Sequence, residues 1–137
     1  MAATPNSIIT PQTPVSAGAV AATGDVAFNA PATTVTLLDR TLNNNGFRGT
    51  RLYAIPRGAI GAALNCLAYA YDGTTKVLLD SALMPVVSPG ASVANAKTDF
   101  GYSEDNAFFL KAGLGIEVAI GTSIANGVAF KLDGGLF

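Results

Sequence analysis

The stretch that decides the fold is "GIEVAIGTSIANGVAFKLDGG", residues 115–135. Apolar residues occupy every second position on both sides of a glycine-bearing loop: Ile116, Val118, Ile120, Val128, Phe130 and Leu132. Successive side chains of a β-strand point to opposite faces, so a period of two indicates strands with one buried face. The stretch therefore predicts a β-hairpin.

Short apolar runs rich in β-branched and aromatic residues continue this pattern upstream. We expect strands within residues 33–39, 50–56, 64–71 and 76–84. Asp72-Gly73 separates the last two runs, and an Asp in such a turn bonds to nearby backbone amides, so we interpret Asp72 as a turn residue and not as a catalytic carboxylate. Strands at this spacing predict an all-β fold, a single β-sandwich or jelly-roll-like domain over residues 25–137.

The first 24 residues differ from the rest, because they contain no charged side chain and three of the seven prolines. Proline fixes φ and biases its predecessor toward extended geometry, so residues 1–24 predict an extended N-terminal arm. We expect its larger apolar side chains, Ile8, Ile9, Val15 and Val20, to be buried against a partner or a neighbouring subunit. A frayed terminus is the alternative.

The composition excludes several chemistries. Histidine is absent and Cys66 is the only cysteine. Catalytic triads need an imidazole base and ordinary zinc sites draw on several Cys and His ligands, so we expect no enzyme activity, no metal and no other cofactor. "GLGIE" at 113–117 lacks the third glycine and the following helix of a nucleotide-binding loop. Cys66, between apolar neighbours, is predicted to be a small buried hydrophobe, with an intermolecular disulfide as the alternative.

Charge is scarce, at 12% of residues, and the net charge is -1. Such a surface is poor in charge for a free monomer, so we expect much of it to meet other protein. Scattered basic residues and the lack of a ~20-residue apolar run predict neither nucleic-acid nor membrane binding, and no small-molecule substrate is expected. Arg48 and Arg51 are either ordinary surface charge or contacts to an acidic patch on a partner. The first basic residue is Arg40, so no secretory leader is predicted and we expect synthesis in a cytoplasm.

Several segments resemble small virion proteins of tailed bacteriophages: "IITPQTP" (8–14), "GFRGTRLYAI" (46–55), "YDGTTKVLLDSALM" (71–84), "TDFGYSEDNAFFLKAG" (98–113) and "GVAFKLDGGLF" (127–137). A subset of those proteins resembles capsid decoration, or cement, proteins, which are all-β, often trimeric and seated on the outer shell. The resemblance implies a virion exterior location, with the major capsid protein and copies of the chain itself as partners. It carries no catalytic motif.

A second class is a receptor- or carbohydrate-binding module of a phage head or tail fibre. In that case the four tyrosines, Tyr53, Tyr69, Tyr71 and Tyr102, would stack on sugars. Tyrosines on strands more often pack into sheets.

Overall fold

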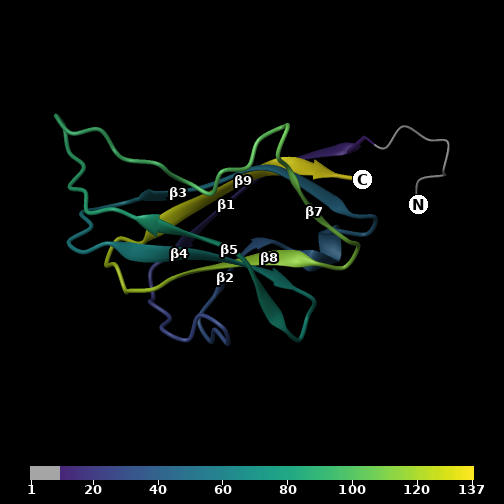
Figure 1. The fold of residues 1–137 in the computed structure, drawn as a ribbon, viewed down its shortest axis with the longest axis horizontal. Helices are drawn as coiled ribbons and strands as arrows, with labels where there is room; N and C mark the ends of the chain where they lie inside the picture. The colour runs from purple at the N-terminus through teal and green to yellow at the C-terminus, as the bar shows by residue number, and fades with distance from the viewer. Residues whose placement is uncertain (1–9) are drawn as a thin grey trace.

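Nine β-strands and one short 3-10 helix make up residues 10–137, the part of the chain that the computed structural model describes (Figure 1). The strands are β1 (Thr13–Ala21), β2 (Val35–Leu38), β3 (Phe47–Pro56), β4 (Leu64–Tyr71), β5 (Lys76–Met84), β6 (Thr98–Asp99), β7 (Phe108–Leu110), β8 (Gly115–Ile120) and β9 (Val128–Leu136), and the 3-10 helix is η1 (Arg40–Leu42). The predicted all-β class is confirmed, and the four strands expected between residues 33 and 84 correspond to β2, β3, β4 and β5.

The strands form two antiparallel sheets that lie one above the other (Figure 1). Sheet A has the order β1-β9-β3-β6, with β7 also paired to β3, and sheet B has the order β2-β8-β4-β5. The core between them is formed by inward-facing apolar side chains of both sheets, among them Phe47, Leu52, Phe130, Leu132, Leu64, Cys66, Ile116 and Val118. Each such side chain contributes about 1.5–3 kcal/mol when fully buried.

The predicted hairpin over residues 115–135 is wrong, although both of its strands exist. β8 lies in sheet B between β2 and β4, whereas β9 lies in sheet A between β1 and β3. The connection 121–127 therefore crosses from one sheet to the other. Alternation along the chain specifies a buried face, but it carries no information about which strand pairs with which.

Strand pairing is nested around one turn. β4 pairs with β5, β3 with β6 and β7, β2 with β8, and β1 with β9. The innermost pair is closed by Asp72-Gly73, where Gly73 has a φ of 101° and the Asp72 carboxylate accepts from the amides of Thr74 (2.8 Å) and Thr75 (2.7 Å). The prediction that Asp72 turns the chain is confirmed.

The boundary expected between residues 24 and 25 does not separate two units. All nine residues of β1 pair with β9, from Thr13 opposite Leu136 to Ala21 opposite Val128, so the sandwich includes residues 13–21. Ile8 and Ile9 lie outside the described residues. The lack of charge in β1 reflects its place in the sandwich, because Val15, Ala17 and Ala19 pack against the core.

Candidate interaction surfaces

Four long connections, residues 22–34, 57–63, 85–97 and 121–127, leave the same end of the sandwich (at left in Figure 1). We call them the neutral end, because the only charged residues among them are Asp25, Arg57 and Lys97. Connection 22–34 continues beneath sheet B, where the Phe28 carbonyl accepts a hydrogen bond from the Tyr69 hydroxyl (2.6 Å).

Backbone hydrogen bonds join these connections to one another in series. The amide-to-carbonyl bonds are Ile124 to Ala22 (2.9 Å), Arg57 to Gly127 (3.1 Å), and a reciprocal pair between Ile60 and Val87 (2.7 and 3.2 Å). The Asn95 side-chain amide also donates to the Pro56 carbonyl (2.6 Å). The neutral end is therefore one linked surface, although it contains almost no regular secondary structure.

Asp25 is the one acidic residue of the neutral end, and its charge is satisfied internally. Its carboxylate accepts from the amides of Ala27 (3.0 Å), Ala32 (2.7 Å) and Thr33 (2.8 Å), and from the Thr33 hydroxyl (3.1 Å). The bond from the Thr33 amide is the largest cause that lowers the pKa of Asp25 below its usual range. Asp25 thus closes connection 22–34 on itself and leaves Arg57 and Lys97 as the charges that face outward.

Large apolar side chains are exposed on and beside the neutral end. Their exposed fractions are 91% for Val26, 58% for Phe28, 64% for Leu83, 61% for Val86 and 51% for Val93. Interface cores are depleted in charged residues, and apolar surface gathered in one region of a domain commonly marks a contact with another protein. The neutral end has both properties.

The opposite end is held by a buried asparagine. Its connections are residues 39–46, 72–75 and 111–114, and they carry Asp39, Arg40, Asp72 and Lys111. Asn43 is 1% exposed, its side-chain amide donates to the carbonyls of Lys111 and Leu114 (2.9 Å each), and its side-chain oxygen accepts from the Gly46 amide (2.8 Å). We call this the anchored end. Sequence reasoning predicted a turn here but missed the role of Asn43, because nothing local distinguishes it from Asn44 and Asn45.

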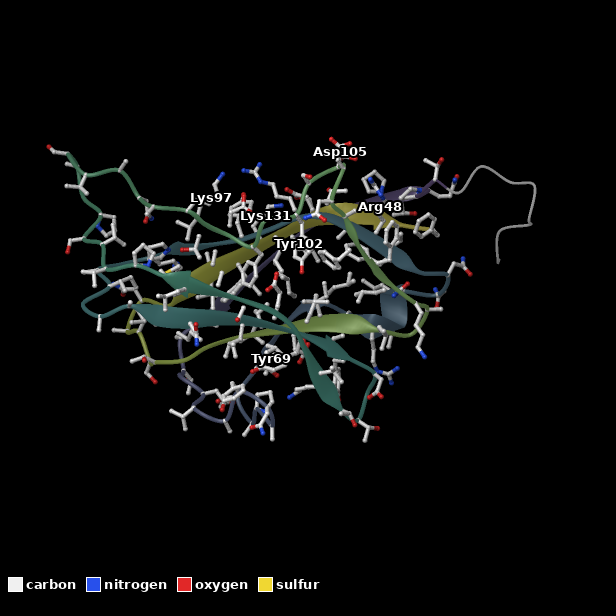
Figure 2. The ribbon with its side chains drawn as sticks, in the orientation of Figure 1. Arg48, Tyr69, Lys97, Tyr102, Asp105 and Lys131 are labelled. Carbon is white, nitrogen blue, oxygen red and sulfur yellow. The ribbon has the colours of Figure 1, made fainter. Side chains whose placement is uncertain are left out.

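The outer face of sheet A carries charges of both signs. In Figure 2, Arg48, Lys97 and Lys131 project from this side of the molecule. Arg48 pairs with Glu104 (3.0 Å) and Lys131 with Asp133 (2.7 Å). Interspersed charges of this kind are typical of a surface that faces water.

Of the six residues predicted to contact a partner, the four within residues 10–137 do not form one surface. Arg48 and Arg51 share the charged face of sheet A, and Val20 is 41% exposed at the far end of β1. Val15 is partly buried and packs against the core of its own chain. A shallow hollow of about 210 Å³ lies beside Arg48 and is lined further by Pro11, Pro14, Thr50, Glu104, Gly134 and Gly135.

The four tyrosines also separate. Tyr69 is fully buried, so it cannot stack on a sugar. Tyr102 lies between the sheets, 4.6 Å from the ring of Phe108, and burial, followed by its hydrogen bond to Asp80, raises its pKa to about 12 (Figure 2). Tyr53 is on the outer face of sheet A, where the Arg51 guanidinium carbon and the Lys97 nitrogen lie 4.8 and 4.5 Å from its ring centre.

Cys66 is buried in the core, as predicted, and burial raises the pKa of its thiol to about 12. A thiol in that position cannot form a disulfide with another chain while the sandwich is folded. Among residues 10–137 the structure holds no group of three or more side chains suited to bind a metal ion. Within the same residues, no helix has the length and apolar character needed to cross a bilayer.

Comparison of the chain with protein-family models, with curated proteins and with solved structures finds no match in any of the three.

Proposed function

We propose that this chain is a non-enzymatic structural protein of a tailed-phage virion, a decoration or cement protein that binds the outer shell and stabilises it through subunit contacts. The neutral end is the observation that carries the proposal. It is a linked surface with exposed apolar side chains and two outward charges, whereas the anchored end and the outer face of sheet A carry charges of both signs.

The energetics of contact support this assignment. Loops already held in place by hydrogen bonds lose little conformational freedom on binding, so more of the energy of apolar burial remains as affinity. A standard interface buries about 1,600 Å² in total, and many symmetry-related copies on one shell multiply its effect. The proposed partners are the major capsid protein and further copies of the chain, as a homotrimer on the exterior of the virion.

We also propose that the sandwich is a jelly roll. The nested strand pairing supports this topology. From the central turn outward, the pairs β4–β5 and β2–β8 lie in sheet B, and the pairs β3–β6 and β1–β9 lie in sheet A, so successive pairs alternate between the two sheets. Jelly rolls occur both in viral shell proteins and in lectins, so the topology is compatible with either class of function.

Adding the protein back to phage shells that lack it tests the proposal. The full chain is expected to occupy the shells and to raise the temperature at which they rupture, while a variant with a charge on the neutral end, Val86→Asp, shows reduced occupancy. The same assay tests an N-terminal arm with a truncated chain that begins at or before Thr13. A deletion of residues 1–24 is unsuitable because it removes β1. A full chain that neither binds the shells nor protects them refutes the proposal.

A carbohydrate-binding module is the second candidate, and one observation favours it. Tyr53 stands on an outer sheet face with Arg51 and Lys97 against its ring, an arrangement suited to an acidic sugar. A glycan array separates the two functions. Selective binding of a glycan that is abolished by Tyr53→Ala would establish the fibre module. Tyr69 is buried and has a role only in the fold.

A further inference from the structure

We propose that the free edge of β1 binds an extended strand of a different protein, which joins sheet A through main-chain hydrogen bonds and covers the seam between β1 and β2. These two strands are edge strands on the same side of the sandwich and contact each other. The seam is the side of the core that lies between them, and it carries the partly buried side chains of Val15, Ala17, Ala19 and Val35. This inference does not depend on the proposed virion function.

The backbone groups of β1 that face away from β9 follow from the hydrogen bonds of the next ladder. At the two ends of β9, the Arg57 amide donates to the Gly127 carbonyl (3.1 Å) and the Phe137 amide donates to the Gly46 carbonyl (3.0 Å), so the odd-numbered residues of β9 bond to β3. Backbone groups alternate in direction along an antiparallel strand, so the even-numbered residues of β9 bond to β1, where their partners are odd-numbered. The groups left without a partner among residues 10–137 are the amides of Ser16, Gly18 and Val20 and the carbonyls of Pro14, Ser16, Gly18 and Val20.

These groups are open to solvent. The four even-numbered residues from Pro14 to Val20 are all exposed. Gly18 has no side chain, so its exposed surface is backbone. The free edge of β1 is therefore a row of accessible donors and acceptors at alternate positions.

The other sheet edges within residues 10–137 have features that oppose the addition of a strand. Natural edges are protected by short length, by charged side chains and by bulges. β2 has four residues and β6 has two, whereas β5 has Lys76 and Asp80 and an extra residue, Leu79, where its register shifts. β1 pairs with β9 over nine consecutive residues without a shift and contains no charged residue. Its one protective residue is Pro14, near one end, so the rest of the edge can pair with another strand.

The chemistry of the edge specifies an extended backbone as its occupant. Alternating amides and carbonyls are complemented by the main chain of an added strand, as in other cases of strand addition to a sheet edge. Every second side chain of the added strand would lie over the seam, because side chains alternate between the two faces of a sheet. We therefore expect an uncharged strand with apolar residues at alternate positions.

A second copy of the chain fits this edge less well than a different protein does. A second β1 would bring only valine and alanine side chains to the seam, and these already pack in the core of their own chain. The other long edge strand, β5, brings its charges and its extra residue. Larger apolar side chains must therefore come from another protein.

Amide hydrogen exchange of the full chain, followed by NMR, tests the proposal with the peptide acetyl-KTVTVTVTK-amide as the probe. In the free chain, the amides of Ser16, Gly18 and Val20 are expected to exchange fast, while those of Ala17 and Ala19 are protected by the ladder. The peptide at about 1 mM is expected to slow the exchange of the three outward amides at least about twofold, which corresponds to half occupancy. The same peptide with every amide nitrogen methylated has no donors and is expected to give no protection.

A matched pair of variants at Gly18 locates the binding. Gly18→Pro removes an outward amide and leaves the bonds to β9, because proline is tolerated where an edge N–H faces solvent. Gly18→Ala keeps the amide, and its Cβ lies at an ordinary contact distance of 3.6 Å from the Phe130 carbonyl oxygen. The peptide is expected to protect the Ser16 and Val20 amides in Gly18→Ala and not in Gly18→Pro. Ala19→Pro, which removes a ladder bond, is expected to lower the melting temperature more than Gly18→Pro does.

Three results would overturn the inference. Slow exchange of the Ser16, Gly18 and Val20 amides without peptide, at any protein concentration, would show that the chain covers its own edge. Protection that increases with protein concentration alone would assign the edge to a second copy. No added protection at about 1 mM peptide, or equal protection in Gly18→Pro and Gly18→Ala, would show that the edge does not accept a strand.

Discussion

The two ends of the sandwich consist of connections between the same strands, yet they use hydrogen bonds in different ways. At the anchored end, Asn43 is buried and its side chain bonds to three backbone groups. At the neutral end, the bonds run mostly between backbone groups of neighbouring loops, and apolar side chains such as Val86 and Val93 point outward. One end therefore stabilises the fold from inside, while the other holds a surface in shape for contact.

The largest expected effect belongs to the anchored end. Asn43→Ala removes three hydrogen bonds in a mostly buried site, those to the carbonyls of Lys111 and Leu114 and the one from the Gly46 amide. The Lys111 carbonyl keeps only the longer bond from the Leu114 amide (3.3 Å). At about 1 kcal/mol for each lost bond, the free energy of unfolding should fall by about 3 kcal/mol.

Urea denaturation measures this loss. Asn44→Ala, at an exposed neighbouring position, is the control and should change stability by less than about 0.5 kcal/mol. Asn95→Ala at the neutral end breaks one bond to the Pro56 carbonyl and should cost about 1 kcal/mol. Equal losses for Asn43→Ala and Asn95→Ala would remove the distinction between the two ends.

An intermediate effect is expected from Asp25, which closes connection 22–34 of the neutral end. Its carboxylate accepts four hydrogen bonds, led by the one from the Thr33 amide, and these hold its pKa below 3.8. A carboxylate whose folded pKa is lowered stabilises the protein above its unfolded pKa, and that stability is lost as the pH falls through the folded pKa. Asp25→Ala should therefore cost about 1–2 kcal/mol at pH 7 and progressively less below pH 3.8.

Urea unfolding at pH 7, 5, 3 and 2 tests this pH dependence. The exposed Asp105→Ala is the control, and its profile should follow that of the wild type. The wild-type and Asp25→Ala curves are expected to converge in acid. If the two curves stay parallel down to pH 2, the Asp25 carboxylate does not hold the loop.

The smallest effect concerns Thr98, at the point where the neutral end rejoins sheet A. Thr98 is 7% exposed, and its hydroxyl has no hydrogen-bond partner among residues 10–137. Thr98→Val replaces that hydroxyl by a methyl group of similar size and should raise stability by up to about 1 kcal/mol, because an unsatisfied buried polar group is removed.

Thr98→Ser is the matched comparison, since it keeps the hydroxyl, deletes the methyl group and should lower the melting temperature. Thermal unfolding of the two variants separates the contribution of the hydroxyl group to stability from that of the methyl group. A lower melting temperature for Thr98→Val would show that the hydroxyl is satisfied by a buried water molecule.

Several features of the fold could be predicted from short stretches of sequence. The turn at Asp72-Gly73 could be predicted because Asp and Gly have strong local preferences for turns. The burial of Cys66 could be predicted from its apolar neighbours in the sequence. The candidate surface was only partly visible. The scarcity of charge predicted contact with other protein, but the six chosen residues came from the arm and the arginines. Of those within residues 10–137, only Val20 is among the large apolar side chains that the structure exposes, whereas Val26, Phe28, Val86 and Val93 lie on connections that were not chosen.

The sequence by itself determined where β2, β3, β4, β5, β8 and β9 run, where the central turn lies and that few charges are available to cover the surface. These properties follow from local backbone preferences and from composition. The sequence did not predict β6 or β7. Tertiary structure alone decided that β8 and β9 belong to different sheets, that residues 13–21 complete sheet A, and that Asn43 is buried while Asn44 is not. The physical reason is that strand pairing and burial depend on residues far apart in the chain. Alternation fixes which face of a strand is apolar, but only the assembled sheets fix what that face meets.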